Sequence, residues 1–121
     1  MSYKKKTIYA LSTGKGKSAI AVIRLSGELS YDCVQNISIN MPKKSHTATF
    51  NELQTDNKEL IDQTITTFYK APKSFTGEDM VEISVHGSDA VIKKIFEIFS
   101  TKKNIRLAKP GEFTRRAFEN N

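Results

Sequence analysis

Cysteine and long apolar runs are both scarce in this sequence. Only Cys33 carries a thiol among 121 residues, which excludes an internal disulfide and a cysteine-cluster metal site and fits a reducing compartment. We expect Cys33 to be a small buried apolar residue rather than a nucleophile. The longest apolar stretch, residues 19–23, has the length of a strand, and the basic residues 1–6 lead into no apolar signal segment. These absences predict a cytoplasmic protein with no membrane partner.

Acidic residues are fewer than basic ones, 13 against 19, and the formal net charge is +6. Such a charge favours anionic partners, including nucleic acids. An RNA-binding surface would gather its basic side chains on one face with aromatic residues between them. Here the lysines and arginines form small clusters near predicted turns and element ends, where lysine is ordinary solvated surface. A basic RNA-binding module therefore stays open as a second hypothesis.

The apolar pattern predicts an α+β fold with two to three helices. The length favours one domain over residues 1–121. Because the elements mix without a βαβ repeat, we expect a mainly antiparallel sheet. Ser30 and Ser88 are the expected N-caps of the first two helices. The predicted strands are 7–11, 19–25, 47–53, 60–69, 80–86 and 105–108, and the predicted helices are 30–37, 88–101 and 112–118.

Residues 14–18 read Gly-Lys-Gly-Lys-Ser and contain the last three residues of a phosphate-binding P-loop. The full motif needs another glycine five residues before the glycine of Gly-Lys-Ser, and Leu11 holds that position. The segment that follows has the pattern of a strand, so no helix N-terminus would face a phosphate. We therefore predict a flexible basic loop instead of a nucleotide site.

Two charged residues interrupt strands that are otherwise apolar or alternating. Arg24 lies late in an apolar strand, where its guanidinium would either bind a ligand or reach water at the strand end. Glu82 shares the polar face of its strand with His86. That face is either the wet side of a half-solvated sheet or a buried face on which the carboxylate needs a partner. His86 is a possible base, but it also fits a hydrogen-bonded strand end.

Four segments then carry a resemblance to a known family. They read Ile-Arg-Leu-Ser-Gly at 23–27, Ser-Phe-Thr-Gly-Glu-Asp at 74–79, Val-Glu-Ile with a later His-Gly across 81–87, and Pro-Gly-Glu-Phe-Thr with Arg-Ala-Phe across 110–118. In this order, over nearly the whole chain, they resemble the N-terminal domain of the MnmE (TrmE) family.

This resemblance implies a dimeric GTPase that acts with a flavin-dependent partner, MnmG (GidA), on the wobble uridine of certain tRNAs, forming a 5-carboxymethylaminomethyl group. The N-terminal domain would be similar to folate-binding aminomethyltransferase modules. It would mediate homodimerisation and bind 5-formyl-tetrahydrofolate, a stand-in for the one-carbon donor. GTP, Mg and K would be bound only by a G domain that this sequence does not contain, so the chain alone is expected to be non-catalytic.

Carried over by position, the family's folate contacts match Arg24 and Glu82. A third contact, a lysine, would fall just beyond Asn121. A pterin presents a ring N–H beside an amino group, and the Glu82 carboxylate can accept from both. Arg24 would bind either the tail carboxylate or the ring carbonyl. A freestanding one-carbon transferase is the third hypothesis, but no general acid or base set accompanies it.

Overall fold

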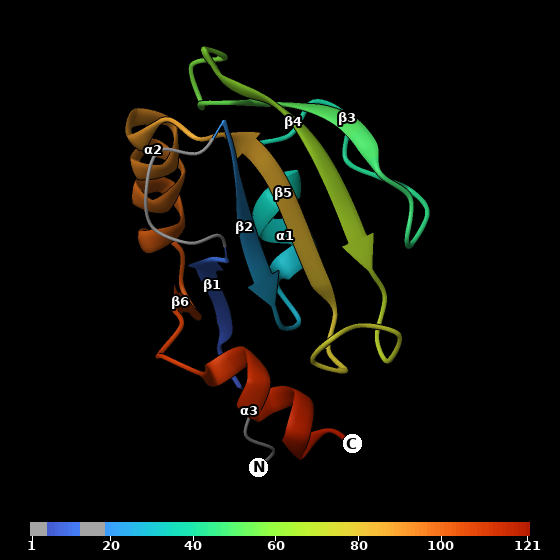
Figure 1. Ribbon diagram of the computed structural model, residues 1–121. Coiled ribbons are helices and arrows are strands. Elements are labelled where there is room, and N and C mark those ends of the chain that lie inside the picture. The colour runs from blue at the N-terminus through green and yellow to red at the C-terminus, as the bar shows by residue number, and fades with distance from the viewer. Residues whose placement is uncertain (1–4, 13–18) are drawn as a thin grey trace.

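One sheet organises the computed structural model, which describes residues 5–12 and 19–121 (Figure 1). Its strands are β1 (Thr7–Leu11), β2 (Ile20–Ser26), β3 (Thr49–Gln54), β4 (Leu60–Tyr69), β5 (Met80–His86) and β6 (Ile105–Leu107). The helices are α1 (Ser30–Gln35), α2 (Asp89–Ser100) and α3 (Glu112–Glu119). The strand order is β3-β4-β5-β2-β1-β6, so β5 and β2 lie at the centre of the sheet.

The sheet is mixed. β3, β4, β5, β2 and β1 pair with their neighbours in antiparallel fashion, and β6 joins β1 in parallel. The predicted α+β class is therefore confirmed. A polar turn joins β3 to β4, in which Lys58 adopts a positive φ of 64° and donates its N–H to the carbonyl of Thr55.

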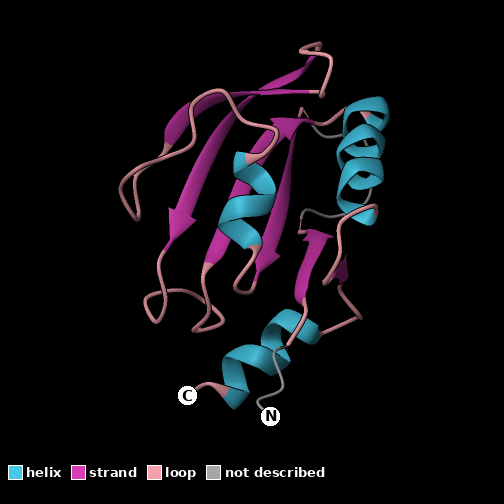
Figure 2. Cartoon of the chain, turned by 180° about the vertical axis from the view of Figure 1, so that it is seen from behind, coloured by secondary structure: helices cyan, strands magenta, loops and turns pink. Residues whose placement is uncertain are grey.

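The hydrophobic core lies on one face of the sheet. Figure 2 shows α1 across this face and α2 beside it. Every second residue of the central strands is buried there, as the alternation in β5 predicts. Tyr9 packs edge-on against Phe99 of α2, with ring centroids 5.3 Å apart. Cys33 is buried in the same cluster, and burial raises the pKa of its thiol to about 12, so the prediction of an inert apolar residue is confirmed.

Most predicted element boundaries are correct to within two residues, but one of the two predicted helix N-caps, Ser30, is wrong. Leu29, not Ser30, is the N-cap of α1. The Ser30 hydroxyl is buried and donates to the carbonyls of Gly27 and Asp79, so it ties the helix to the loop before β5. Ser88 does hold the N-cap position of α2, but its side chain makes no capping hydrogen bond.

The Gly-Lys-Ser segment, residues 14–18, lies outside the described residues. Its continuation is described: β2 begins at Ile20. A strand therefore follows the segment, as predicted, and not the helix that a P-loop requires.

Candidate functional site

Strands β2 and β5 lie side by side (Figure 1), and Arg24 and Glu82, far apart in the sequence, are direct neighbours across them. The guanidinium donates from Nε to Oε2 of Glu82 at 2.9 Å, and its Nη2 lies 2.8 Å from the same oxygen in an ion pair. Both side chains are about a quarter exposed, 29% and 26%. Neither sequence interpretation of Arg24 alone describes it, because β2 continues to Ser26 and the guanidinium meets a carboxylate that solvent still reaches.

Tyr69, the last residue of β4, contacts the other oxygen of the same carboxylate. Its hydroxyl donates to Oε1 of Glu82 at 3.1 Å. Burial, followed by the negative charge of Glu82, raises the pKa of Tyr69 above its ordinary value of 10.0. The phenol therefore stays protonated, and remains a donor, throughout the neutral range. Arg24, Glu82 and Tyr69 form one continuous polar cluster on three adjacent strands.

Two aromatic rings flank the guanidinium of Arg24. Its Cζ lies 5.6 Å from the ring centre of Phe75 and 5.9 Å from that of Phe113, both within cation–π range. Phe75 belongs to the loop before β5 and is 56% exposed. Phe113 lies in the first turn of α3. The polar cluster thus sits beside flat apolar surfaces, which is the usual composition of a site for a planar organic ligand.

A second ionic cluster fixes α3 and the 71–79 loop in place. Arg116, only 3% exposed, donates to Glu78 at 3.0 Å and to the carbonyl of Lys6 at 2.7 Å. Asn120 donates to the carbonyl of Thr76 at 2.8 Å. These contacts join the segments that carry Phe75 and Phe113, so they set the aromatic sides of the site.

Glu112 is the centre of that second cluster and is 3% exposed. Arg106 binds both of its oxygens, at 2.7 and 2.6 Å, while the backbone N–H of Lys109 and Arg116 also donate to it. The hydrogen bonds from Arg106 are the largest cause that lowers the pKa of Glu112 to about 2. All of its acceptor positions are used by protein groups, which is the pattern of a structural carboxylate.

His86 ends β5 in a pair with Asp62. Its backbone N–H donates to Oδ2 of Asp62 at 2.7 Å, and its Nδ1 lies 2.7 Å from Oδ1. The imidazole is 68% exposed. The interpretation of His86 as a hydrogen-bonded strand end is therefore confirmed. It lies four residues from Glu82 along β5, or about 13 Å, and does not join the Arg24 cluster.

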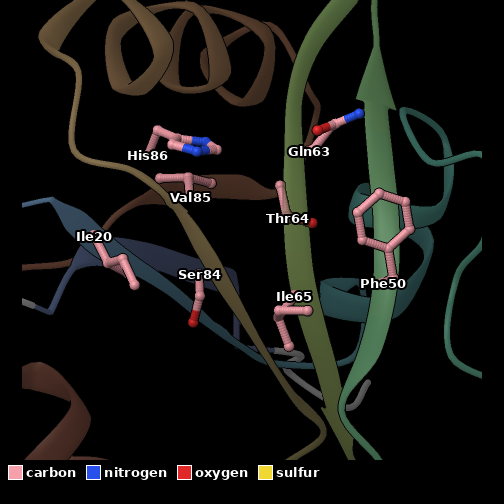
Figure 3. Close-up of a pocket in the computed structure, with 8 residues that line it drawn as sticks. All are labelled: Ile20, Phe50, Gln63, Thr64, Ile65, Ser84, Val85 and His86. Atoms are coloured by element: carbon pink, nitrogen blue, oxygen red, sulfur yellow. The ribbon is translucent and has the colours of Figure 1, made fainter.

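A shallow apolar hollow lies beside His86 on the same face of the sheet (Figure 3). Ile20, Phe50 and Ile65 line it from three strands and are 57%, 54% and 44% exposed. Figure 3 shows these side chains around Ser84. The Glu82 side of this face thus carries a polar cluster, while the His86 side carries exposed apolar surface.

Sequence reasoning found Arg24 and Glu82 but missed Tyr69, Phe75 and Phe113. Phe75 and Phe113 lie inside the segments that resemble the family, so the resemblance could have pointed to them. Tyr69 gave no signal, because its contact with Glu82 depends on β4 being the neighbour of β5.

Two features are absent from the part of the chain that the structure describes: a cluster of metal ligands and a membrane-spanning helix. Within residues 5–12 and 19–121, no group of three or more His, Cys, Asp or Glu side chains is arranged to hold a metal ion. In that same part of the chain, no helix has the length and apolar character needed to cross a membrane.

Comparison with known proteins now places the chain. The profile of the family described as "GTP-binding protein TrmE N-terminus" matches residues 7–121. A tRNA modification GTPase MnmE from Wolbachia sp. subsp. Drosophila simulans is 48% identical over 120 residues, 99% of this chain and 27% of that protein. The proteins of the same name from Anaplasma marginale and Thermotoga maritima are each 46% identical, over 94% of this chain and 25% of their own length.

The chain therefore spans about a quarter of the length of these curated relatives. Because the family profile covers almost all of it and the identities are well above the level at which homology is in question, the chain belongs to the TrmE family and corresponds to its N-terminal domain.

Proposed function

We propose that this chain is the folate-binding and dimerisation domain of a tRNA-modifying GTPase, and that Arg24 and Glu82 bind 5-formyl-tetrahydrofolate. The observation that carries the proposal is the partly exposed Arg24–Glu82 pair, whose guanidinium lies near two aromatic rings in a member of the TrmE family. The larger protein would act on wobble uridine together with a flavin-dependent partner, MnmG (GidA). GTP, Mg and K would be held by a domain outside this chain.

The chemistry of the pair suits a pterin. An ionised carboxylate accepts hydrogen bonds on both oxygens, and protein groups already lie against both on Glu82: Nε and Nη2 of Arg24 at Oε2, and the Tyr69 hydroxyl at Oε1. A ligand that brings two parallel N–H groups donates to both oxygens, so it meets Arg24 at Oε2. We infer that Arg24 turns from Glu82 toward the ligand, where its guanidinium would meet the ring carbonyl or the tail carboxylate.

Dimerisation is supported by the apolar hollow. Ile20, Phe50 and Ile65 expose a contiguous apolar surface beside the site, and such surface on a water-soluble domain marks an interaction site. A second copy of the same chain is the proposed occupant, since the same patch on two copies gives a closed two-fold contact.

Sedimentation velocity tests this part of the proposal. The wild-type chain should sediment as a dimer at high concentration, and Phe50→Glu should shift it to the monomer because a charge then enters the apolar contact. Ser100→Glu, which adds the same single negative charge at an exposed position of α2, is the matched control. A wild-type chain that stays monomeric at every concentration would contradict dimerisation.

Calorimetry with 5-formyl-tetrahydrofolate tests the folate site. We expect saturable binding that Glu82→Ala weakens at least about tenfold, equivalent to roughly 1.4 kcal/mol, without a change in melting temperature. Glu97→Ala, at an exposed position of α2, removes a carboxylate far from the site and should leave the affinity unchanged. The titration should include a longer natural chain that continues beyond Asn121, where the family's third contact is expected. Absence of saturable binding in both chains would overturn the folate proposal.

A further inference from the structure

We infer that Tyr69 is a positioning residue of the folate site, whose hydroxyl holds the Glu82 carboxylate in the plane that accepts a ligand's paired N–H groups. This inference rests on the proposed function. Its basis is the contact between the Tyr69 hydroxyl and Oε1 of Glu82, at 3.1 Å, on the oxygen that Arg24 does not bind.

The role follows from what happens to Glu82 when a ligand arrives. In the free chain, Arg24 fixes Oε2 and Tyr69 fixes Oε1. If Arg24 turns toward the ligand, the Tyr69 hydroxyl still donates to Glu82 from within the described part of the chain. Without it, the carboxylate would rotate about its side chain and lose the orientation that two parallel hydrogen bonds need.

The ring of Tyr69 is itself held from behind. His46 packs edge-to-face against it, with centroids 5.0 Å apart and planes at 85°. The backbone N–H of His46 donates to the carbonyl of Phe68 at 2.7 Å, and the backbone N–H of Lys70 donates to the Ser45 hydroxyl at 2.9 Å. These two bonds hold the residues directly before and after Tyr69, so residues 45–46 fix the end of β4.

The phenol also suits this role chemically. Burial and the charge of Glu82 raise the pKa of Tyr69 above 10.0. Its hydroxyl therefore stays protonated at neutral pH and donates to Glu82. A hydroxyl is a single donor, whereas a lysine or arginine at this place would neutralise Glu82 and occupy further acceptor positions. The carboxylate therefore keeps its charge and part of its acceptor capacity for the ligand.

A double-mutant cycle read by calorimetry with 5-formyl-tetrahydrofolate tests the inference. Tyr69→Phe should weaken binding about five- to tenfold in the wild-type background, the scale of one ordinary hydrogen bond acting indirectly on the ligand. In the Glu82→Ala background the same change should alter affinity less than about twofold, because Tyr69 acts through Glu82. Tyr31→Phe is the matched control, since it removes a hydroxyl that donates to the carbonyl of Pro42 and not to Glu82.

The support from His46 has its own readout. His46→Ala should weaken binding by a smaller factor, and His46→Phe should restore it because a ring again packs on Tyr69. Both variants lose the contact between the imidazole Nδ1 and the Ser45 hydroxyl, and both carry a side chain at the same positive φ of 65°. They therefore differ only in the ring.

A ligand-free measurement tests the contact between Tyr69 and Glu82, and the affinities separate failure of this inference from failure of the proposed function. Carbon-13 NMR titration of the Tyr69 ring should give a lower pKa in Glu82→Gln than in the wild type, because the neighbouring charge has gone. Wild-type affinity in Tyr69→Phe, or an equal loss in both backgrounds, would overturn the inference while leaving folate binding intact. If the wild type does not bind the folate at all, both the inference and the proposed function are wrong, even where the titration shows the contact.

Discussion

The two arginine–glutamate clusters of this chain contain the same chemical groups in different settings. Glu112 is buried and receives donors from Arg106, Arg116 and the Lys109 backbone. Glu82 is about a quarter exposed and receives side-chain hydrogen bonds from Arg24 and Tyr69. Protein donors use all the acceptor positions of Glu112, whereas Glu82 keeps some of its acceptor positions open to solvent or a ligand.

A structural carboxylate thus differs from one available to a ligand in its burial and in how many of its acceptor positions the protein uses. A buried, saturated carboxylate holds segments together, and breaking it leaves an uncompensated charge. A partly exposed carboxylate beside aromatic rings contributes little to stability, since solvent screens the pair, but it can exchange its partner for a ligand. The two clusters lie side by side, because Arg116 and Asn120 tie down the loop that carries Phe75.

The largest expected effect is on stability and comes from the buried cluster. Arg116→Ala should lower the free energy of unfolding by about 3–5 kcal/mol, because Glu78 and Glu112 lose a shared partner in a buried place. Urea denaturation measures it. Arg115→Ala removes the exposed neighbouring arginine and should change stability by less than about 0.5 kcal/mol. Equal losses of stability in the two variants would contradict the structural role assigned to the buried cluster around Arg116.

The pH dependence of stability should follow Glu112. Its folded-state pKa of about 2 lies below the ordinary value of 4.5, so the ionised group contributes stability above pH about 4.5 that is lost as the pH falls toward about 2. Urea denaturation of the wild type and Glu112→Gln at several pH values measures this loss. The difference between the two should shrink across that window, and a constant difference would contradict the assignment.

Much of this architecture was predictable from the sequence. The alternation in β5 and the helical spacing in α2 placed those elements within two residues of their observed bounds, because burial on one face imposes a period on the apolar residues. The interruption of an apolar strand marked Arg24 as unusual, and the structure places it in the candidate site beside Glu82. Glu82 was found partly through its family resemblance.

The rest depended on contacts between segments that are distant in sequence. Nothing in the local pattern reveals that β2 and β4 both lie beside β5, which is what brings Arg24 and Tyr69 to opposite oxygens of Glu82. The N-cap at Leu29 was missed for a similar reason, since the Ser30 hydroxyl is used by carbonyls of Gly27 and the remote Asp79.

The smallest expected effect concerns the exposed pair at His86. His86→Ala should cost less than about 1 kcal/mol of stability, because the imidazole is mostly solvated and the backbone N–H at this position still donates to Asp62. It should leave folate affinity within about twofold, since the residue lies outside the Arg24 cluster. Calorimetry and thermal melting measure both. A tenfold loss of affinity would move the binding site toward the apolar hollow.

Mapping the bound ligand by NMR tests the central claim most directly. When 5-formyl-tetrahydrofolate saturates the isotope-labelled chain, the backbone amides of Arg24, Glu82 and Phe75 should show the largest chemical-shift changes, while those of Ile65 and His86 change little. Changes centred on Ile65 and His86 instead, or none at saturating ligand, would contradict the assignment of the Arg24–Glu82 pair as the folate site.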